Sequence, residues 1–262
     1  MGSAEELTPA VELRGFTKRY AGRCVVNDLH LAVQRGQIVG YLGRNGAGKS
    51  TTIKALMGFL DSWEGEVRVL GLDPRTQATE IKALVGYVPE NAALYEQLTV
   101  AEHVLLVARL FALDPVVART RAESLLAGFD LLDRVDARIG SLSKGMRQKL
   151  LITSALLHAP KVLFLDEPLS GLDAHAAVLV KKLLRAMADR GMTIFYSSHA
   201  LDVVQQVCDR IIILDEGKVV AAGSYDELAR TNGARNLEGL FTQLTDRGDE
   251  ESRLAHILQG LS

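Results

Sequence analysis

One stretch decides the fold of this chain: Gly43-Arg44-Asn45-Gly46-Ala47-Gly48-Lys49-Ser50. It matches the pattern G-x-x-x-x-G-K-[ST] in full, follows the apolar run 37–42 and precedes residues 51–57, which favour a helix. In such a strand–loop–helix unit the glycines let backbone N–H groups turn inward, and the helix adds its positive N-terminal end. The stretch therefore predicts a loop that binds phosphate groups, called the phosphate loop below. The alternative is a glycine-rich turn without a ligand.

Two side chains of the phosphate loop carry specific chemistry. Lys49 would reach the β- and γ-phosphates of a nucleoside triphosphate, and the Ser50 hydroxyl would hold Mg²⁺. The remaining nucleotide-binding candidates are the other loop residues and the one after the loop: Gly43, Arg44, Asn45, Gly46, Ala47, Gly48 and Thr51.

Two carboxylates follow a second apolar run, 161–165. Because ligands of open α/β sheets bind at the carboxyl ends of strands, Asp166 and Glu167 are expected near the phosphate loop. Asp166 would orient Mg²⁺ through its waters, and Glu167 would polarise an attacking water as a general base. The alternative is an acidic helix start without a catalytic part, but the phosphate loop in the same chain favours the catalytic interpretation.

The composition is that of an ordinary globular protein. The chain has 262 residues, 48% of them hydrophobic and 24% charged, with a net charge of −2, so no electrostatic footprint for nucleic acid is present. Cys24 and Cys208 match no metal-binding spacing and are expected to be reduced packing residues. No signal peptide and no membrane-spanning helix are expected. Any role at a membrane would therefore depend on a partner.

The strand signals predict two kinds of sheet. Residues 11–36 alternate in polarity around turn signals, which predicts short antiparallel strands, and 65–71 and 82–88 are interpreted as further strands. The run 161–165 is continuously apolar, as in a buried parallel strand. Two similar runs follow it with helices between, at 191–198 and 210–214. The pattern predicts an α/β fold with a mainly parallel sheet and an N-terminal antiparallel β subdomain.

A helical segment interrupts this α/β pattern at about 99–160. Leu and Ala recur there at spacings of three and four residues, and Thr99 with Glu102 forms a capping-box pattern. We expect an inserted helical subdomain within one domain over 10–244. The tail 245–262 is expected to be helical, and it could be a dimer contact, a regulatory tail or simply a packed helix, which is the favoured interpretation.

Two further motifs point to a family. The segment 142–149 reads Leu-Ser-Lys-Gly-Met-Arg-Gln-Lys, and the segment 166–173 reads Asp-Glu-Pro-Leu-Ser-Gly-Leu-Asp. Together with the phosphate loop they resemble the ATP-binding subunit of an ABC transporter, with the motifs in family order from about Val11 to Leu244. The resemblance implies a P-loop NTPase core that binds ATP and Mg²⁺ and hydrolyses ATP.

The resemblance also implies roles for single residues. Tyr20 matches the aromatic residue that stacks on adenine, although a core or turn tyrosine is the alternative. Glu90 lies where the family usually has Gln, a residue that contacts metal and water and couples the nucleotide to the membrane partner. His199 matches the switch histidine that contacts the γ-phosphate, so the catalytic set is Glu167, His199 and Lys49.

The remaining motif residues imply a shared site. Ser143 and Gly145 belong to the signature that caps the γ-phosphate of ATP on another subunit, and Asp173 belongs to the loop that joins the two sites. The helix expected after Ser143 would aim its N-terminus at that phosphate. The resemblance implies a head-to-tail homodimer, a separate integral-membrane permease, and a location at the cytoplasmic face of the cell (inner) membrane.

Several positions depart from the commonest family sequence. Arg44 replaces a usual Pro, Lys144 and Met146 replace Gly and Gln, and Gly171 replaces Ala. The most informative departure is Glu90 for Gln, because a carboxylate can ligate Mg²⁺ but repels phosphate. Glu90 and its neighbours resemble the bacterial ABC-2 (export-type) subgroup, so the expected function is to energise export.

Two other functions are alternatives to transport. A soluble ABC-type ATPase in DNA repair, chromosome structure or translation would bring long coiled coils, tandem ATPase domains or basic surfaces, none of which this sequence has. A regulatory subunit that binds ATP without turnover would not need Glu167 and His199. The sequence does not identify the cargo, which the permease would select.

Overall fold

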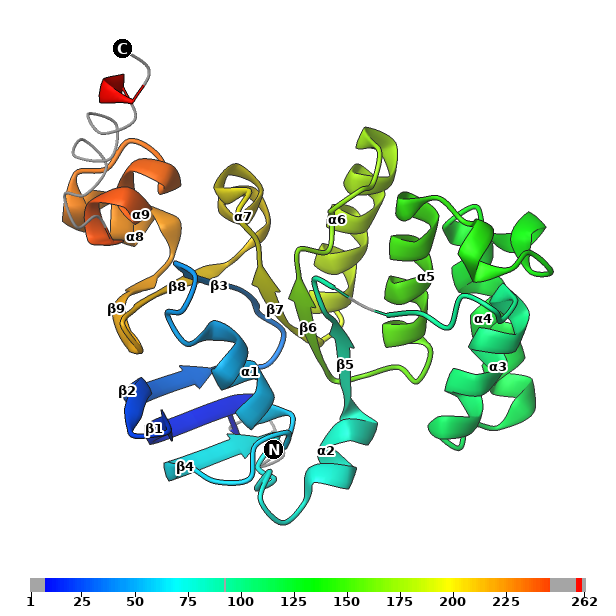
Figure 1. Cartoon of the computed structure of the whole chain (residues 1–262), viewed down its shortest axis with the longest axis horizontal. Helices are drawn as coiled ribbons and strands as arrows, with labels where there is room; N and C mark the ends of the chain where they lie inside the picture. The colour runs from blue at the N-terminus through cyan, green and yellow to red at the C-terminus, as the bar shows by residue number, and fades with distance from the viewer. Residues whose placement is uncertain (1–7, 92, 246–257, 261–262) are drawn as a thin grey trace.

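The computed structural model describes residues 8–91, 93–245 and 258–260. They form an α/β fold with a mixed six-stranded sheet, a three-stranded antiparallel sheet and helices on both sides (Figure 1). The fold class expected from the sequence is therefore confirmed.

The three-stranded sheet is built from the N-terminal part of the chain. Its order is β2-β1-β4, and both pairings are antiparallel. The strands are β1 (Val11–Tyr20), β2 (Arg23–Val33) and β4 (Glu64–Val69). The antiparallel prediction is thus confirmed, but β1 and β2 are long strands of 10 and 11 residues rather than short ones.

The six-stranded sheet has the order β5-β6-β7-β3-β8-β9, with β9 antiparallel to β8 and the other pairings parallel. Its strands are β3 (Ile38–Gly43), β5 (Val85–Val88), β6 (Val162–Asp166), β7 (Thr193–Ser197), β8 (Arg210–Asp215) and β9 (Lys218–Gly223). Because β3, β6 and β7 are adjacent and parallel, the phosphate loop and the carboxylates after β6 emerge at the same edge.

One sequence interpretation is wrong in part. Residues 82–88 were expected to be a strand, yet α2 (Ala78–Leu84) occupies the first three of these positions and β5 begins at Val85. Only Ile81 of α2 is buried, so the helix has too little apolar periodicity to be distinguished from a short strand.

The helical segment forms one group at an end of the molecule (Figure 1). It contains α3 (Val100–Leu110), α4 (Pro115–Gly128), two 3-10 turns η1 (Leu132–Arg134) and η2 (Ile139–Ser141), and α5 (Lys144–Leu156). The capping box of Thr99 and Glu102 is present at the start of α3. The other helices are α1 (Lys49–Leu56), α6 (Ala174–Ala188), α7 (Leu201–Val207), α8 (Tyr225–Asn232) and α9 (Leu237–Thr245).

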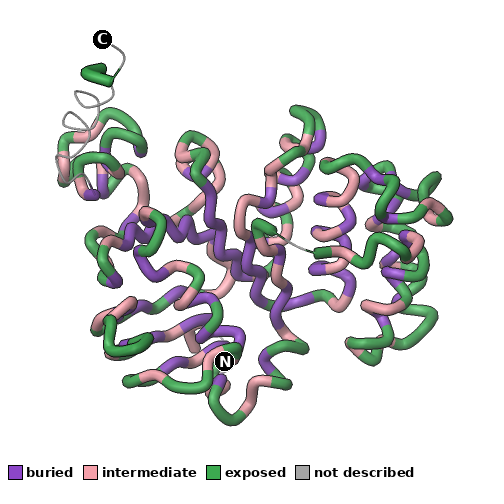
Figure 2. The backbone as a smooth tube through the Cα atoms, in the orientation of Figure 1, coloured by how far each residue is buried: buried purple, intermediate pink, exposed green. Residues whose placement is uncertain are grey.

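The six-stranded sheet separates two hydrophobic cores, and its strands apart from the edge strand β9 are largely buried (Figure 2). On β3, Ile38 and Leu42 belong to the core shared with α3 to α7, whereas Val39 and Tyr41 belong to the core shared with α1 and the three-stranded sheet. This alternation explains why β3 reads as a continuous apolar run. The strand that leads into the phosphate loop is thus packed against a core on each face.

The helices of the described residues include none that is long and apolar enough to cross a membrane. Cys24 and Cys208 are free thiols. The expected break at 248–252 lies outside the described residues, as does most of the amphipathic segment expected at 254–261.

Candidate functional site

The phosphate loop connects β3 to α1, as the motif requires. Gly48, the residue before α1, has a φ of 105°, in the left-handed region that favours glycine. A Cβ atom there would lie 3.0 Å from Cγ2 of Val26 and 3.1 Å from the carbonyl oxygen of Val25. The loop backbone is therefore pressed against β2, and the unpaired N–H groups at the start of α1 remain available for an anion.

Lys49 lies at the centre of a group of charged residues. Its ammonium donates to the carbonyl oxygens of Gly43 and Arg44. Burial lowers the pKa of Lys49, while the charges of Asp166, Glu167 and Glu90 act in the opposite direction. These interactions place the three carboxylates around Lys49. We call Lys49, Glu90, Asp166, Glu167 and His199 the phosphate cluster.

Asp166 is the last residue of β6 and pairs with Ser197 at the end of β7. Burial raises the pKa of Asp166, the Ser197 hydrogen bond lowers it, and the charge of Glu90 raises it further. A divalent cation held by Asp166 and Glu90 would offset the cost of burying the Asp166 carboxylate and the repulsion between the two carboxylates. The site therefore fits Mg²⁺, with Ser50 exposed in the first turn of α1 as a hydroxyl ligand.

Glu167 has a strained backbone that the neighbouring strand holds in place. Its φ of 51° is uncommon for a residue with a side chain and costs on the order of 1 kcal/mol. The N–H of Glu167 donates to Ser197 O at 2.9 Å. Its carboxylate accepts from the Ser198 hydroxyl at 2.9 Å and from the N–H of His199. The carboxylate is thereby fixed beside the segment that carries the histidine.

His199 follows β7 and is exposed, so its imidazole is accessible. His199 shares a small pocket of about 80 Å³ with Gly43, Lys49 and Ser198. The lysine and the histidine therefore face one space, next to the carboxylate of Glu167. Glu90 is exposed two residues after the end of β5.

A second group of expected residues lies elsewhere. Ser143 caps the N-terminus of α5, where its hydroxyl accepts from the N–H of Met146 at 3.2 Å. Asp173 caps α6, and its pKa is lowered by the N–H of Ala176 and then by the charge of Lys149 on α5. We call Ser143, Gly145 and Asp173 the signature cluster. Among the described residues, no hydrogen bond or ion pair joins it to the phosphate cluster.

The segment 167–173 connects the two clusters. A Cβ atom on Gly145 would lie 2.7 Å from the carbonyl oxygen of Gly171, so the start of α5 packs directly on this segment. Gln148, which is 7% exposed, donates to the carbonyl oxygen of Pro168 at 3.0 Å. The start of α5 is therefore in direct contact with the residue next to Glu167.

Two of these contacts involve residues that sequence reasoning assigned no role. Ser198 fixes the carboxylate of Glu167, and Gln148 anchors Pro168. A hydroxyl directly before the expected histidine is a usable signal for Ser198. Gln148 gave no such signal, because the role of a buried glutamine becomes visible only when the structure shows the group that it contacts, here the carbonyl of Pro168.

The other expected residues lie as follows. Tyr20 ends β1, is 43% exposed, and has the ammonium of Lys18 at 4.9 Å from its ring centre. Its ring is accessible, as adenine stacking would require. Asn45 and Gly46 are exposed at the tip of the phosphate loop, and Thr51 is half-buried in α1.

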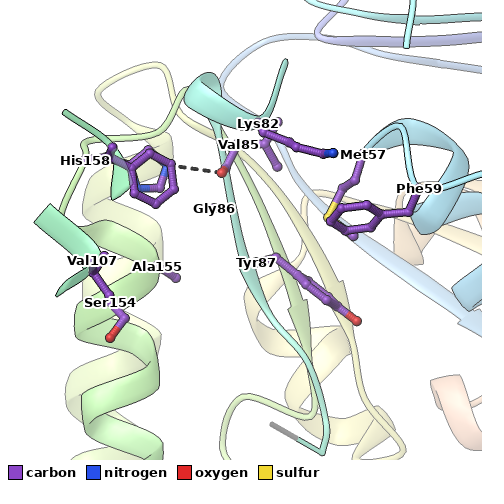
Figure 3. Close-up of a pocket in the computed structure, with 11 residues that line it drawn as sticks. Met57, Phe59, Lys82, Val85, Gly86, Tyr87, Val107, Ser154, Ala155 and His158 are labelled. Carbon is purple, nitrogen blue, oxygen red and sulfur yellow. Dashed lines mark hydrogen bonds between the residues drawn. The ribbon is translucent and has the colours of Figure 1, made fainter. Parts of the chain in front are cut away.

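A groove of about 350 Å³ lies where the helical group meets the core (Figure 3). One wall is β5 with Tyr87, and the other is formed by α3 and α5 with His158. The His158 ring stacks on Phe111 with ring centres 3.8 Å apart and donates from Nε2 to Val85 O at 3.1 Å. Phe59 borders the groove and is 53% exposed.

Comparison with known proteins gives concordant matches. The ABC transporter family model matches residues 26–170. The ABC transporter ATP-binding protein NatA of Bacillus subtilis is 33% identical over 85% of this chain and 91% of its own length. The daunorubicin/doxorubicin resistance ATP-binding protein DrrA of Streptomyces peucetius is 36% identical over 95% of this chain and 75% of its own length.

Two further matches agree. The Nod factor export ATP-binding protein I of Burkholderia orbicola is 36% identical over 82% of this chain and 70% of its own length. A solved ATP-binding subunit of an ABC transporter superposes with a TM-score of 0.85 and 32% identity, covering 90% of this chain and 99% of that one. With its phosphate loop, carboxylates and signature in family order, this chain belongs to the ATP-binding, ATP-hydrolysing subunits of the ABC transporter family.

Proposed function

We propose that this chain uses Mg²⁺ and ATP, in a head-to-tail homodimer, to energise export through a separate integral-membrane permease. The observation that carries the catalytic part is the hydrogen-bonded arrangement of Glu167, Ser198 and His199 beside Lys49. The proposal includes no nucleic-acid ligand, in keeping with the net charge of −2.

The phosphate loop would bind the triphosphate through its backbone N–H groups, and Tyr20 would stack on the adenine. Lys49 would neutralise charge on the β- and γ-phosphates, where phosphoryl transfer needs it most. Bound Mg²⁺ would supply charge neutralisation between these phosphates. Ser50, Asp166 and Glu90 are the groups proposed to hold it.

Glu167 would act as the general base for the attacking water. A base must be held within hydrogen-bond reach of its proton, and the contacts with Ser198 and His199 fix the carboxylate in one orientation. His199 would contact the γ-phosphate with its exposed imidazole. Burial of Lys49 beside these groups strengthens their electrostatic effect on the reacting phosphate.

The exposed Ser143 would complete the site of a second copy. The start of α5 offers a helix N-terminus, a Ser143 hydroxyl with a proton to donate, and Gly145 without a side chain. These groups are suited to bind a phosphate. Among the described residues, no hydrogen bond or ion pair joins them to the phosphate loop of their own chain. Closure of two copies head to tail would bring each signature cluster over the other copy's ATP.

The catalytic assignment is tested by Glu167→Gln. The amide oxygen can accept from His199 N–H, while the Ser198 hydroxyl can rotate to accept from the amide NH₂, so the local geometry survives. Loss of the base should lower phosphate release by about 10²- to 10⁴-fold. ATP binding and ATP-dependent dimerisation should persist. Phosphate release at the wild-type rate would disprove the role of Glu167.

Export is the direction that the relatives support. The names of two relatives, the Nod factor export ATP-binding protein I and the daunorubicin/doxorubicin resistance ATP-binding protein DrrA, refer to export and to drug resistance. Glu90 and the residues after it fit the same ABC-2 subgroup. We therefore propose that the chain works at the cytoplasmic face of the cell (inner) membrane, held there by its permease.

The groove of Figure 3 is the surface we propose for the permease. It lies between two bodies of the fold, and its wall β5 leads within two residues to Glu90 of the phosphate cluster. The pKa of Tyr87 in this wall is raised by burial and then by the charge of Asp166, so the groove and the metal residues are close. A cytoplasmic segment of the permease with an apolar tip suits Phe59, Phe111 and the stacked His158.

Docking can be tested with Phe59→Asp, which places a charge at the border of the groove. When the chain is co-produced with its permease, this variant should no longer sediment with membranes. ATP hydrolysis by the isolated variant should remain within about twofold, because Phe59 lies outside the phosphate cluster. Val220→Asp, at a 41% exposed site on β9, is the matched control. Equal membrane association of both variants would contradict the docking surface.

A further inference from the structure

Arg44 uses its side chain outside the phosphate loop. Its Nη1 donates to the carbonyl oxygen of Thr245 at 2.8 Å, across 201 positions of the sequence. Thr245 belongs to α9 and is 4% exposed. Polar main-chain groups in buried residues are paired, and Arg44 donates to this carbonyl.

The contact joins α9 to a distant residue. The guanidinium of Arg44 reaches α9 from the phosphate loop and binds its main chain. Hydrogen bonds from a charged donor are stronger than neutral ones. The residue that replaces the common proline of this loop therefore ties the loop to α9.

The other end of α9 is attached to the segment after His199. The N–H of Leu237, at the start of α9, donates to Oε1 of Gln205 on α7 at 3.1 Å. Leu237 and Leu240 are buried in the same core as Val204 of α7. Since α7 begins two residues after His199, α9 connects the histidine segment to the phosphate loop.

The middle of α9 reaches the reacting groups. Phe241 lines the pocket of about 80 Å³ that contains Lys49, Ser198 and His199. Its ring is half-buried against the core. A displacement of α9 would therefore change three things together: the start of the phosphate loop, one wall of this pocket, and the support of α7.

We infer that Arg44 is a positioning residue and that α9 is a brace that holds the phosphate loop and the His199 segment in register. Binding of ATP at the loop stabilises the docking of α9, and docking of α9 raises ATP affinity by the same factor, because coupling between sites is reciprocal. This inference rests on the proposed roles of Lys49 and His199.

The kinetic test is Arg44→Ala. The loop backbone holds the phosphates equally before and during the reaction, so its displacement should raise KM for ATP while kcat changes little. We expect KM to rise about threefold to tenfold and kcat to stay within about twofold, as for the loss of one charged hydrogen bond. Arg44→Lys retains a cation and should recover most of the loss. An unchanged KM in Arg44→Ala would overturn the inference.

Arg75→Ala is the matched control. Arg75 also donates to main-chain carbonyls, those of Trp63 and Gly65, but at the three-stranded sheet. Its removal should leave KM within about twofold of the wild type, because distant sites act independently. If KM rose equally in both variants, the effect of Arg44→Ala would be general destabilisation of the protein. That result would overturn the inference.

Hydrogen exchange separates the brace from a purely structural contact. In the Glu167→Gln protein, ATP with Mg²⁺ should increase protection of the amides of α1 and also those at the end of α9. Adding Arg44→Ala should abolish the response of α9 while α1 still responds at saturating ATP. If α1 responds and α9 does not in the Glu167→Gln protein, the brace is overturned but the proposed function stands. If α1 fails to respond, both are overturned.

Discussion

The phosphate cluster and the signature cluster are built in opposite ways. The phosphate cluster is assembled within the chain at the ends of parallel strands. Its carboxylates are held by the segment that carries His199: Glu167 binds Ser198 and the N–H of His199, and Asp166 binds Ser197. The signature cluster is assembled from two helix starts, and Ser143 and Asp173 are exposed. The difference fits the proposal that each chain supplies one half each of two sites in a head-to-tail dimer.

The link between the clusters is as informative as their separation. Gly145 packs on Gly171, and Gln148 holds Pro168, so six residues of chain join the general base to the signature side. In a homodimer, the signature cluster of one copy would contact the ATP bound to the other copy. Through the segment 167–173, this contact would change the surroundings of Glu167 in the copy that supplies the signature cluster. Our three predictions test whether the clusters are separate halves and how the link between them works.

The largest effect is expected from mixing two inactive variants. Lys49→Ala removes the phosphate cluster's cation. Ser143→Asp keeps an N-cap for α5 but places a negative charge opposite phosphate. Each variant alone should lack phosphate release. A 1:1 mixture should recover about a quarter of wild-type activity, because half of the dimers are mixed and each mixed dimer has one intact site of two.

The recovery distinguishes shared sites from sites within one chain. Gel filtration with ATP should show dimers in the mixture, and circular dichroism should show both variants folded. Ser143→Ala mixed with Lys49→Ala is a useful control, since it removes the hydroxyl without adding charge. Zero recovery from mixtures that do form dimers would refute the head-to-tail arrangement.

Much of the phosphate cluster could be predicted from sequence because its residues are contiguous in motifs. The phosphate loop and the pair Asp166-Glu167 each follow an apolar run, and parallel neighbours bring such strand ends together. His199 and Glu90 were assigned through the family resemblance, and each also follows a strand of this sheet. Local patterns were enough for the phosphate loop and the two carboxylates, whereas these two residues needed the resemblance.

Contacts between distant segments could not be predicted in this way. The bond from Arg44 to Thr245 depends on how α9 packs, and the positive φ of Glu167 depends on its neighbour Ser197. The end of α2 was mistaken for strand because the side chains of this helix are mostly exposed. Such features depend on tertiary packing, which neither motif spacing nor periodicity records.

A smaller effect is expected from Gly145→Ala, which tests the link. The added Cβ would lie 2.7 Å from Gly171 O, a backbone atom that cannot rotate away, so α5 or the segment 167–173 must shift. Such overpacking typically costs about 1–3 kcal/mol. We expect turnover to fall by about one order of magnitude, while the affinity of the isolated chain for ATP stays within about twofold.

Gly128→Ala is the matched control, because Gly128 is helical and a Cβ atom there meets nothing within 4 Å. This variant should retain wild-type turnover and gain stability of about 0.5–1 kcal/mol from helix propensity. Equal turnover of the two alanine variants would show that the contact between Gly145 and Gly171 does not transmit strain.

The smallest effect concerns the helices that support the signature cluster. His103 on α3 is 7% exposed and its Nε2 donates to the Ser154 hydroxyl on α5 at 3.0 Å, while its buried Nδ1 has no partner among the described residues. Burial lowers the pKa of His103 below its ordinary 6.5. The unfolded chain therefore binds this proton more readily, so stability is complete above pH 6.5 and declines as pH falls towards the lowered folded pKa.

Urea unfolding at pH 7.5 and pH 5.5 measures this decline. The amide of His103→Gln can donate to Ser154 without titrating, so this variant should show a smaller drop in unfolding free energy between the two pH values. Some drop should remain, because burial also lowers the pKa of His158 at the end of the same helix bundle. An identical drop in wild type and variant would remove His103 as a cause. A smaller drop would show that mild acid weakens the packing of α3 on α5, the helix that carries Gly145, while the phosphate cluster stays anchored in the sheet.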